Sequence, residues 1–193
     1  MIQTAENVAA DGGFSREQID EVTLLRHEQY ETALADDRAF QRRYMVAVDV
    51  PGRKGGVDTI DSDQGVHETT AEGLASLKPT LDDGVTTAGS QTHPADGSAG
   101  VLVTSESRAR ELGRDGGAVR VLASSTSRVG KAQMPKAPVP AARSALESAG
   151  ISIKDIDVIT THTPFAVNDL WFSREMGVEI GQMNPFGLSL IHI

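Results

Sequence analysis

Residues 157–176, DVITTHTPFAVNDLWFSREM, carry the strongest indication of the fold. Residues 157–161 are rich in β-branched side chains, which is typical of a short buried strand. His162-Thr-Pro-Phe165 then predicts a turn, and residues 166–176 have the spacing of a helix. Because open α/β sheets bind ligands where their strands end, His162 is a candidate site residue. The alternative is a histidine that only orders the turn.

Strands and helices alternate along the rest of the chain in the same way, which predicts an α/β fold. Ser15 and Gln18 fit a capping box at the start of a long helix. His27, on this helix, is expected to be exposed. Trp171, in the predicted helix 166–176, is expected in the core or at an interface. Residues 51–68 are expected to form an exposed loop. Further strands are predicted at 44–50, 99–103 and 118–123, and further helices at 5–10, 69–78, 105–112 and 141–149.

Composition limits the possible partners. The chain has 193 residues, 39% of them hydrophobic, and a net charge of −9, which is typical of one globular domain or two small ones. An acidic balance argues against nucleic acid as a partner. Apolar runs stay far below the roughly 18 residues of a membrane helix, so no membrane contact is expected. Without a leader of signal type, a cytoplasmic location is expected.

The chain contains no cysteine. This excludes a disulfide framework, a thiolate zinc site and a cysteine nucleophile within these residues. Asp58, Asp61, Asp63 and Glu68 lack the spacing of a calcium loop, so no metal site is expected.

Residues 86–97, TTAGSQTHPADG, form a second candidate site because small residues let a ligand approach the backbone closely. An ordinary loop with turn chemistry is the alternative. His67, in a polar segment, is a weaker candidate for contact with a ligand.

Several segments together, in order, resemble the thiolase family of acetyl-CoA acetyltransferases. They are residues 4–9, 15–18, 74–79, 85–89, 96–103, 138–141, 145–150, 155–157 and Asn184. The resemblance implies an α/β, partial thiolase fold, with the loop domain and the first part of the C-terminal α/β half. It assigns 1–94 to part of the loop domain, 95–117 to the end of the N-terminal half, 118–187 to the C-terminal half, and 188–193 to a non-native tail.

The resemblance also implies a function, an acyl-CoA acyltransferase that forms or cleaves a carbon–carbon bond next to a thioester. Coenzyme A thioester is then the substrate, with no covalently bound cofactor. His162 falls where many thiolases have an asparagine that holds a water beside the thioester enolate, and it can donate a hydrogen bond in its place. His93 replaces a glycine and is expected to crowd the thioester pocket. The residues implied to contact the substrate are Leu81, Ala88, Thr92, His93 and Phe165.

Thiolases use two cysteines and the histidine of a Gly-His-Pro motif, and this chain contains neither the cysteines nor the motif. We therefore expect the chain alone to be an inactive internal piece, and a complete parent to be a homodimer or homotetramer. Two alternatives remain. One is a non-catalytic, thiolase-like subunit that binds CoA or serves assembly, and the other is a truncated product that folds poorly and has no function of its own.

Overall fold

The computed structural model describes residues 1–52, 55–92, 96–113 and 118–187. Its elements are α1 (Ile2–Gly12), α2 (Arg16–Ala33), α3 (Ala35–Arg38), η1 (Gln41–Arg43), β1 (Val48–Pro51), β2 (Val57–Ile60), α4 (Ala71–Ser76), α5 (Glu106–Leu112), η2 (Met134–Lys136), α6 (Pro138–Ala149), η3 (Ile153–Asp155), α7 (Ala166–Met176) and η4 (Ile180–Gln182). The mixture of helix and sheet agrees with the predicted class.

The long helix α2 begins at the predicted capping box. The Ser15 amide donates to Gln18 Oε1 at 2.9 Å, and the Ser15 hydroxyl accepts from the Gln18 amide at 3.3 Å. The helix ends at Ala33, and Asp36 and Asp37 then have φ of 53° and 56°. Aspartate tolerates this left-handed conformation better than most residues, so the chain turns sharply here.

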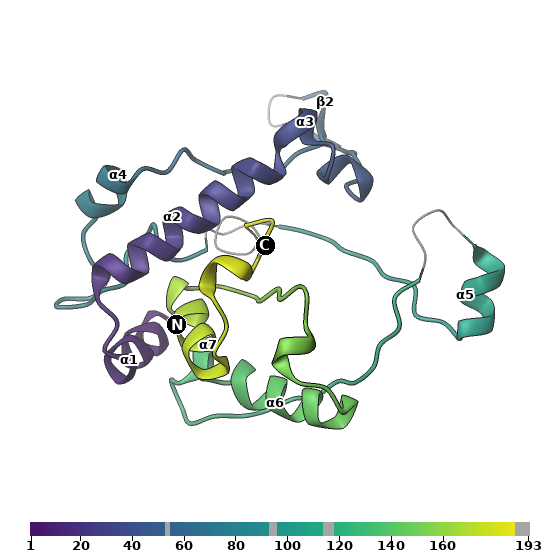
Figure 1. The fold of residues 1–193 in the computed structure, drawn as a ribbon. Helices are drawn as coiled ribbons and strands as arrows, with labels where there is room; N and C mark the ends of the chain where they lie inside the picture. Colours follow the sequence, from purple (N-terminus) through teal and green to yellow (C-terminus); the bar gives the residue numbers. More distant parts are fainter. Residues whose placement is uncertain (53–54, 93–95, 114–117, 188–193) are drawn as a thin grey trace.

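Helices α1, α2 and α7 meet around the main core (Figure 1). Apolar residues at helical spacing give α1 and α2 one buried face each, and these faces pack against the first turn of α7. The buried members are Ala5, Val8, Ala9, Ile19, Val22, Phe165, Ala166 and Val167. A second cluster of Val139, Phe172 and Met183 lies between α6 and the other side of α7. Thus α7 is packed on both sides, and its first turn is held in place.

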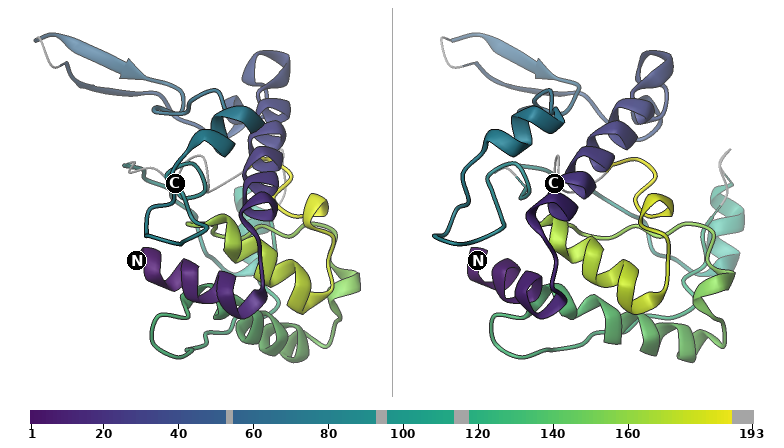
Figure 2. Two further views of the ribbon diagram at one scale, coloured as in Figure 1. Left: turned by 90° about the vertical axis from the view of Figure 1, so that its left-hand side faces the viewer. Right: turned by 60° about the vertical axis from the view of Figure 1, so that its left-hand side comes forward.

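The sheet of the described residues is one antiparallel hairpin, in which Val48 pairs with Ile60 and Pro51 with Val57. Figure 2 shows this hairpin projecting from the helices. The predicted strand at 44–50 therefore begins later than expected. The prediction of a loop throughout 51–68 was wrong, because residues 57–60 form β2.

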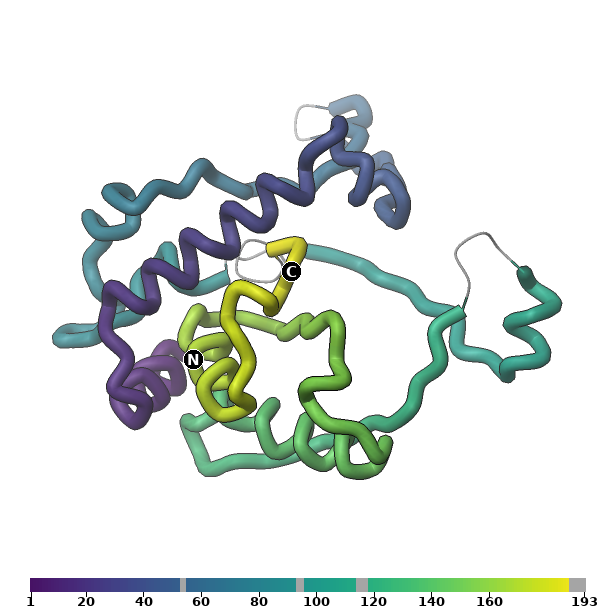
Figure 3. Tube along the Cα trace, in the orientation of Figure 1, coloured from purple at the N-terminus to yellow at the C-terminus, as the bar shows by residue number. Residues whose placement is uncertain are grey.

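Three other predicted strands were wrong. Residues 99–103 and 118–123 are extended arms that lead to and from α5 without pairing to a neighbour in the described chain (Figure 3). Val101 is 89% exposed and Val119 96% exposed. Residues 157–161 make only one isolated bridge, between Ile159 and Met183, and Val158 is exposed. A β-branched run gives propensity, but a strand needs a hydrogen-bonded partner.

The helix predictions fared better, since each predicted helix is present: α7 has the predicted bounds 166–176, and the others are shifted at one or both ends. Trp171 is partly buried against both cores, as expected. His27 was predicted to be exposed, but it is half-buried, and Thr69 Oγ1 lies 2.8 Å from its Nε2. Helical periodicity could not show that residues 68–69 cover this face of α2. No helix among the described residues is long and apolar enough to cross a membrane.

Candidate functional site

The candidate site begins at the turn before α7, residues 161–165. Thr163, Pro164 and Phe165 are buried, whereas His162 is exposed. Neighbouring side chains in extended backbone point to opposite sides. Thr161 and Thr163 therefore face the interior while His162 faces solvent. His162 was predicted to follow a buried strand directly, but residues 157–161 do not form one.

A buried carboxylate lies under this turn. Asp169, in the first turn of α7, accepts hydrogen bonds from the hydroxyls of Thr161 at 2.6 Å and Thr163 at 2.9 Å, both on Oδ1. Its Oδ2 accepts from Arg26 Nε and from Asn184 Nδ2, each at 2.9 Å. We call these five residues the Asp169 network. A carboxylate is also favoured by the positive end of the helix dipole at this position.

The Asp169 network joins three separate parts of the chain. The side chains of Arg26 on α2 and Asp169 on α7 are both 0% exposed. Arg26 also donates to the carbonyls of Ile180 at 3.2 Å and Met183 at 3.0 Å. Asn184 Oδ1 accepts from the Thr161 amide at 2.7 Å. These bonds satisfy polar groups that burial would otherwise penalise, and they fix the turn that carries His162.

The second candidate segment forms the neighbouring wall. The Thr92 amide donates to the Pro164 carbonyl at 2.9 Å, and the Ala166 amide donates to the Ser90 carbonyl at 3.0 Å. Gln91 bridges to Phe165 in antiparallel fashion. The two motifs, which are far apart in the sequence, therefore lie side by side at the N-terminus of α7.

Glu6 on α1 supports this wall and was missed in the sequence. Its Oε1 accepts from the Thr86 amide at 2.8 Å, and its Oε2 accepts from the Val85 amide at 3.0 Å. The Thr87 amide then donates to the Ser90 hydroxyl at 2.9 Å. No sequence signal identified Glu6, because a carboxylate that holds a distant turn looks like any other charge on a helix.

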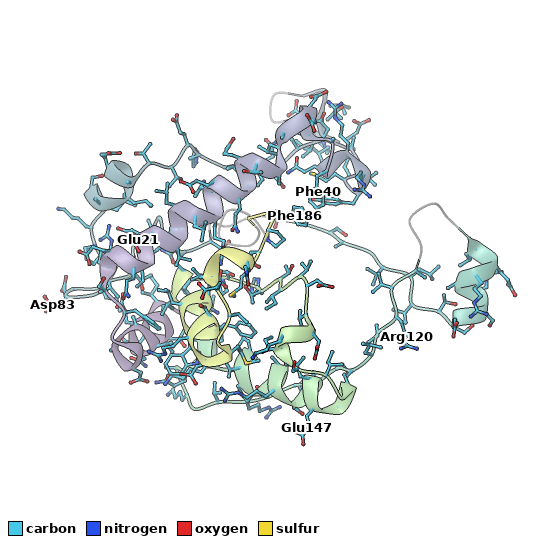
Figure 4. All side chains as sticks on the ribbon, viewed as in Figure 1. Glu21, Phe40, Asp83, Arg120, Glu147 and Phe186 are labelled. Carbon is cyan, nitrogen blue, oxygen red and sulfur yellow. The ribbon has the colours of Figure 1, made fainter. Side chains whose placement is uncertain are left out.

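The other predicted contact residues are placed differently. Phe165 is 3% exposed and packs in the main core, whereas Ala88 is exposed. Leu81 is 37% exposed on the turn whose Asp83 points away from the molecule at the left edge of Figure 4. The structure thus brings Thr92 and Phe165 to the turn of His162, and Leu81 stands apart from this pairing. His93 lies outside the described residues.

Two open hollows on the described surface lie elsewhere. One, of about 280 Å³, is lined by Arg38, Gln41, Arg42, Met45, Ala47 and Asp61. The other, of about 490 Å³, is lined by Leu24, His27, Glu28, Glu31, Glu68 and Thr69. His67 is exposed. Among the described residues, no three His, Asp or Glu side chains are arranged to hold a metal ion.

Comparison with known proteins identifies the family. Residues 1–107 match the family model described as "Thiolase, N-terminal domain", and residues 117–192 match "Thiolase, C-terminal domain". The chain belongs to the thiolase family. The two matches leave residues 108–116 uncovered, a stretch that includes most of α5.

Curated thiolases are similar along nearly the whole chain. It is 37% identical to an acetyl-CoA acetyltransferase of Allochromatium vinosum over 97% of the chain and 47% of that protein. It is 38% identical to the 3-oxoadipyl-CoA/3-oxo-5,6-dehydrosuberyl-CoA thiolase of Escherichia coli over 97% of the chain and 47% of that protein. The chain thus spans about half the length of these relatives.

Solved structures agree. The Bacillus anthracis acetyl-CoA acetyltransferase superposes with a TM-score of 0.87 at 31% identity, covering 100% of this chain and 49% of that one. Human mitochondrial 3-ketoacyl-CoA thiolase superposes with a TM-score of 0.86 at 30% identity, covering 99% of this chain and 47% of that one. The chain therefore has a partial α/β thiolase fold, although several strands expected in it have no partner in the described residues.

Proposed function

We propose that this chain provides part of a thiolase-type acyltransferase that acts on acyl-CoA. The observation that carries the proposal is the match of both thiolase domains, in order, to one chain whose relatives are named for acetyl-CoA and 3-ketoacyl-CoA chemistry. The geometry supports it, since the turn of His162 and the segment of Thr92 are paired at one helix N-terminus.

In this proposal His162 stabilises negative charge on the thioester oxygen. When a proton leaves the carbon next to a thioester, charge moves onto the carbonyl oxygen, and a fixed donor at that oxygen lowers the barrier. The exposed imidazole of His162 acts as such a donor, directly or through a water. Thr92 contacts the thioester arm of the substrate.

The chain alone is proposed to be inactive in acyl transfer. An acyl group passes from CoA to a thiolate, and this sequence contains no cysteine. The nucleophile and the base therefore come from other residues of a complete thiolase, for which we propose a homodimer or homotetramer.

A chimera tests this function. Residues 1–187 replace the matching segment of the Bacillus anthracis acetyl-CoA acetyltransferase, and CoA-dependent cleavage of acetoacetyl-CoA is followed by its absorbance. We expect cleavage, and a loss of about 10²–10³-fold in kcat for His162→Ala. His162→Asn is expected to retain activity, because asparagine is the residue of many thiolases at this position. His67→Ala is the control at an exposed histidine.

The competing proposal is a non-catalytic, thiolase-like subunit that binds CoA or serves assembly, and it is favoured by the histidine at position 162 in place of asparagine. A folded chimera that binds CoA but forms no labelled acyl adduct would support it. Formation of the adduct would eliminate it.

A further inference from the structure

The exposed histidine lies between the partly buried Thr161 and the buried Thr163, which share one acceptor. Thr161 and Thr163 donate to the same oxygen, Asp169 Oδ1, at 2.6 and 2.9 Å. In extended backbone, side chains two positions apart lie on the same side, as these two hydroxyls do. The side chain between them, His162, must then point away from Asp169.

The acceptor itself is rigidly held. Arg26 Nε and Asn184 Nδ2 both donate to Asp169 Oδ2, and the side chains of Arg26 and Asp169 are 0% exposed. Asn184 also donates to Thr161 Oγ1 at 2.8 Å and accepts from the Thr161 amide at 2.7 Å. Rotation of the Thr161–Thr163 backbone would therefore break several buried hydrogen bonds at once.

We propose that Asp169 is a positioning residue for His162. By accepting hydrogen bonds from the two flanking threonines, Asp169 sets the direction in which the His162 side chain points. It also limits the orientations that the imidazole samples. A donor held in place before the substrate arrives needs no reorganisation when charge develops. This proposal rests on the proposed function of His162 at the thioester.

A purely stabilising role explains the arrangement less well. Buried ion pairs are weak evidence for stability, since desolvation offsets much of their attraction. The Asp169–Arg26 pair alone would join α2 to α7. The hydrogen bonds from Thr161 and Thr163 to the other carboxylate oxygen join no second helix to α7. They hold the two residues on either side of His162.

The test uses the 193-residue chain and two substitutions at one position. Thr163→Ser keeps the hydroxyl, whereas Thr163→Val keeps the shape and loses it. Thr23→Val is the matched control, because Thr23 is also 0% exposed and donates to the Ile19 carbonyl at 2.9 Å, outside the Asp169 network. Asp169→Asn is a second variant that removes the charged acceptor.

Two properties are measured, the χ1 couplings of His162 by NMR and the affinity for acetyl-CoA by titration. For Thr163→Val and Asp169→Asn we expect couplings averaged over rotamers and affinity weakened by about tenfold. Thr163→Ser and Thr23→Val should match the wild type. Unchanged His162 couplings in Thr163→Val, or equal changes in Thr23→Val, would overturn the proposal.

The measurements distinguish failure of the positioning role of Asp169 from failure of the proposed function. If the couplings of His162 average as expected but the chimera does not cleave acetoacetyl-CoA, the positioning role is supported and the proposed function is rejected. If the wild type binds acetyl-CoA and the couplings do not respond to Thr163→Val, the function stands and the positioning role is rejected.

Discussion

Arg26 of α2 and Asp169 of α7 are separated by 143 positions in the sequence and paired at 2.9 Å, and neither side chain is exposed. This pair is the centre of the Asp169 network. It couples the helix that begins at Ser15 to the turn that presents His162. Loss of either charge is therefore expected to destabilise the contact between α2 and α7.

Asp169→Asn preserves the size of the side chain but leaves the Arg26 guanidinium buried without a counter-ion. We expect the free energy of unfolding to fall by about 3–5 kcal/mol, measured by urea denaturation. Glu111→Gln breaks the ion pair between Arg108 and Glu111, whose side chains are 58% and 63% exposed. It should change the free energy of unfolding by less than about 1 kcal/mol. Equal losses in the two variants would contradict the importance of the buried pair.

Glu6→Gln replaces a carboxylate that accepts from two backbone amides with an amide that has one acceptor oxygen. The Val85 amide then faces an NH₂ group in place of Oε2 at 3.0 Å and shares Oε1 with the Thr86 amide, at a loss of about 1–3 kcal/mol in the free energy of unfolding. Hydrogen exchange at these two amides should accelerate. Glu21→Gln, at an exposed position of α2, is the control, and similar exchange in the two variants would argue against this role for Glu6.

Gly187 packs directly on the backbone of α2. A Cβ at this position would overlap the Arg26 carbonyl and the Tyr30 amide, and φ is +69°. Gly150 also has φ of +69°, but a Cβ there meets no atom within 4 Å. Both alanine variants carry the same backbone strain, so Gly187→Ala should lower the free energy of unfolding by about 1–3 kcal/mol more than Gly150→Ala. Equal denaturation midpoints would show that the described contact is absent.

Burial lowers the pKa of His27 below its ordinary value of 6.5. Glu28, Glu31 and Glu68 line the same groove and favour the charged imidazole, but burial outweighs them. The unfolded chain thus takes up the proton first, and the free energy of unfolding should fall as the pH drops below about 6.5. His27→Gln should show a weaker dependence, and a slope equal to that of the wild type would contradict the effect of burial on His27.

The pKa of Tyr30 is raised to about 12, first by burial and then by the charge of Asp63, which accepts from the Tyr30 hydroxyl at 3.1 Å. The unfolded phenol ionises near 10, so the folded state loses stability as the pH rises from about 10 to about 12. A spectrophotometric titration should show a late tyrosinate component that Tyr30→Phe removes. Its persistence in the variant would assign it to Tyr44, whose pKa is also raised by burial.

A stacked aromatic pair shows why some contacts could not be predicted. The rings of Phe40 and Phe186 lie 3.8 Å apart at 15°, and Figure 4 shows them side by side. Nothing in the local sequence of either residue indicates the other. In contrast, the residues of the capping box, Ser15 and Gln18, are only three positions apart, and this box was predicted correctly.

Sequence patterns alone were enough to predict the helices, the capping box of α2, the resemblance to the thiolase family and His162 as a candidate site residue. These depend on local spacing or on order along the chain. Which apolar runs form strands depended on the folded structure, since the runs of Val101 and Val119 have no strand partner in the described chain. The folded structure alone placed Glu6 beneath Val85 and Asp169 beneath His162. Buried polar side chains bond partners that are distant in the sequence, and the spacing of residues within a short segment does not identify those partners.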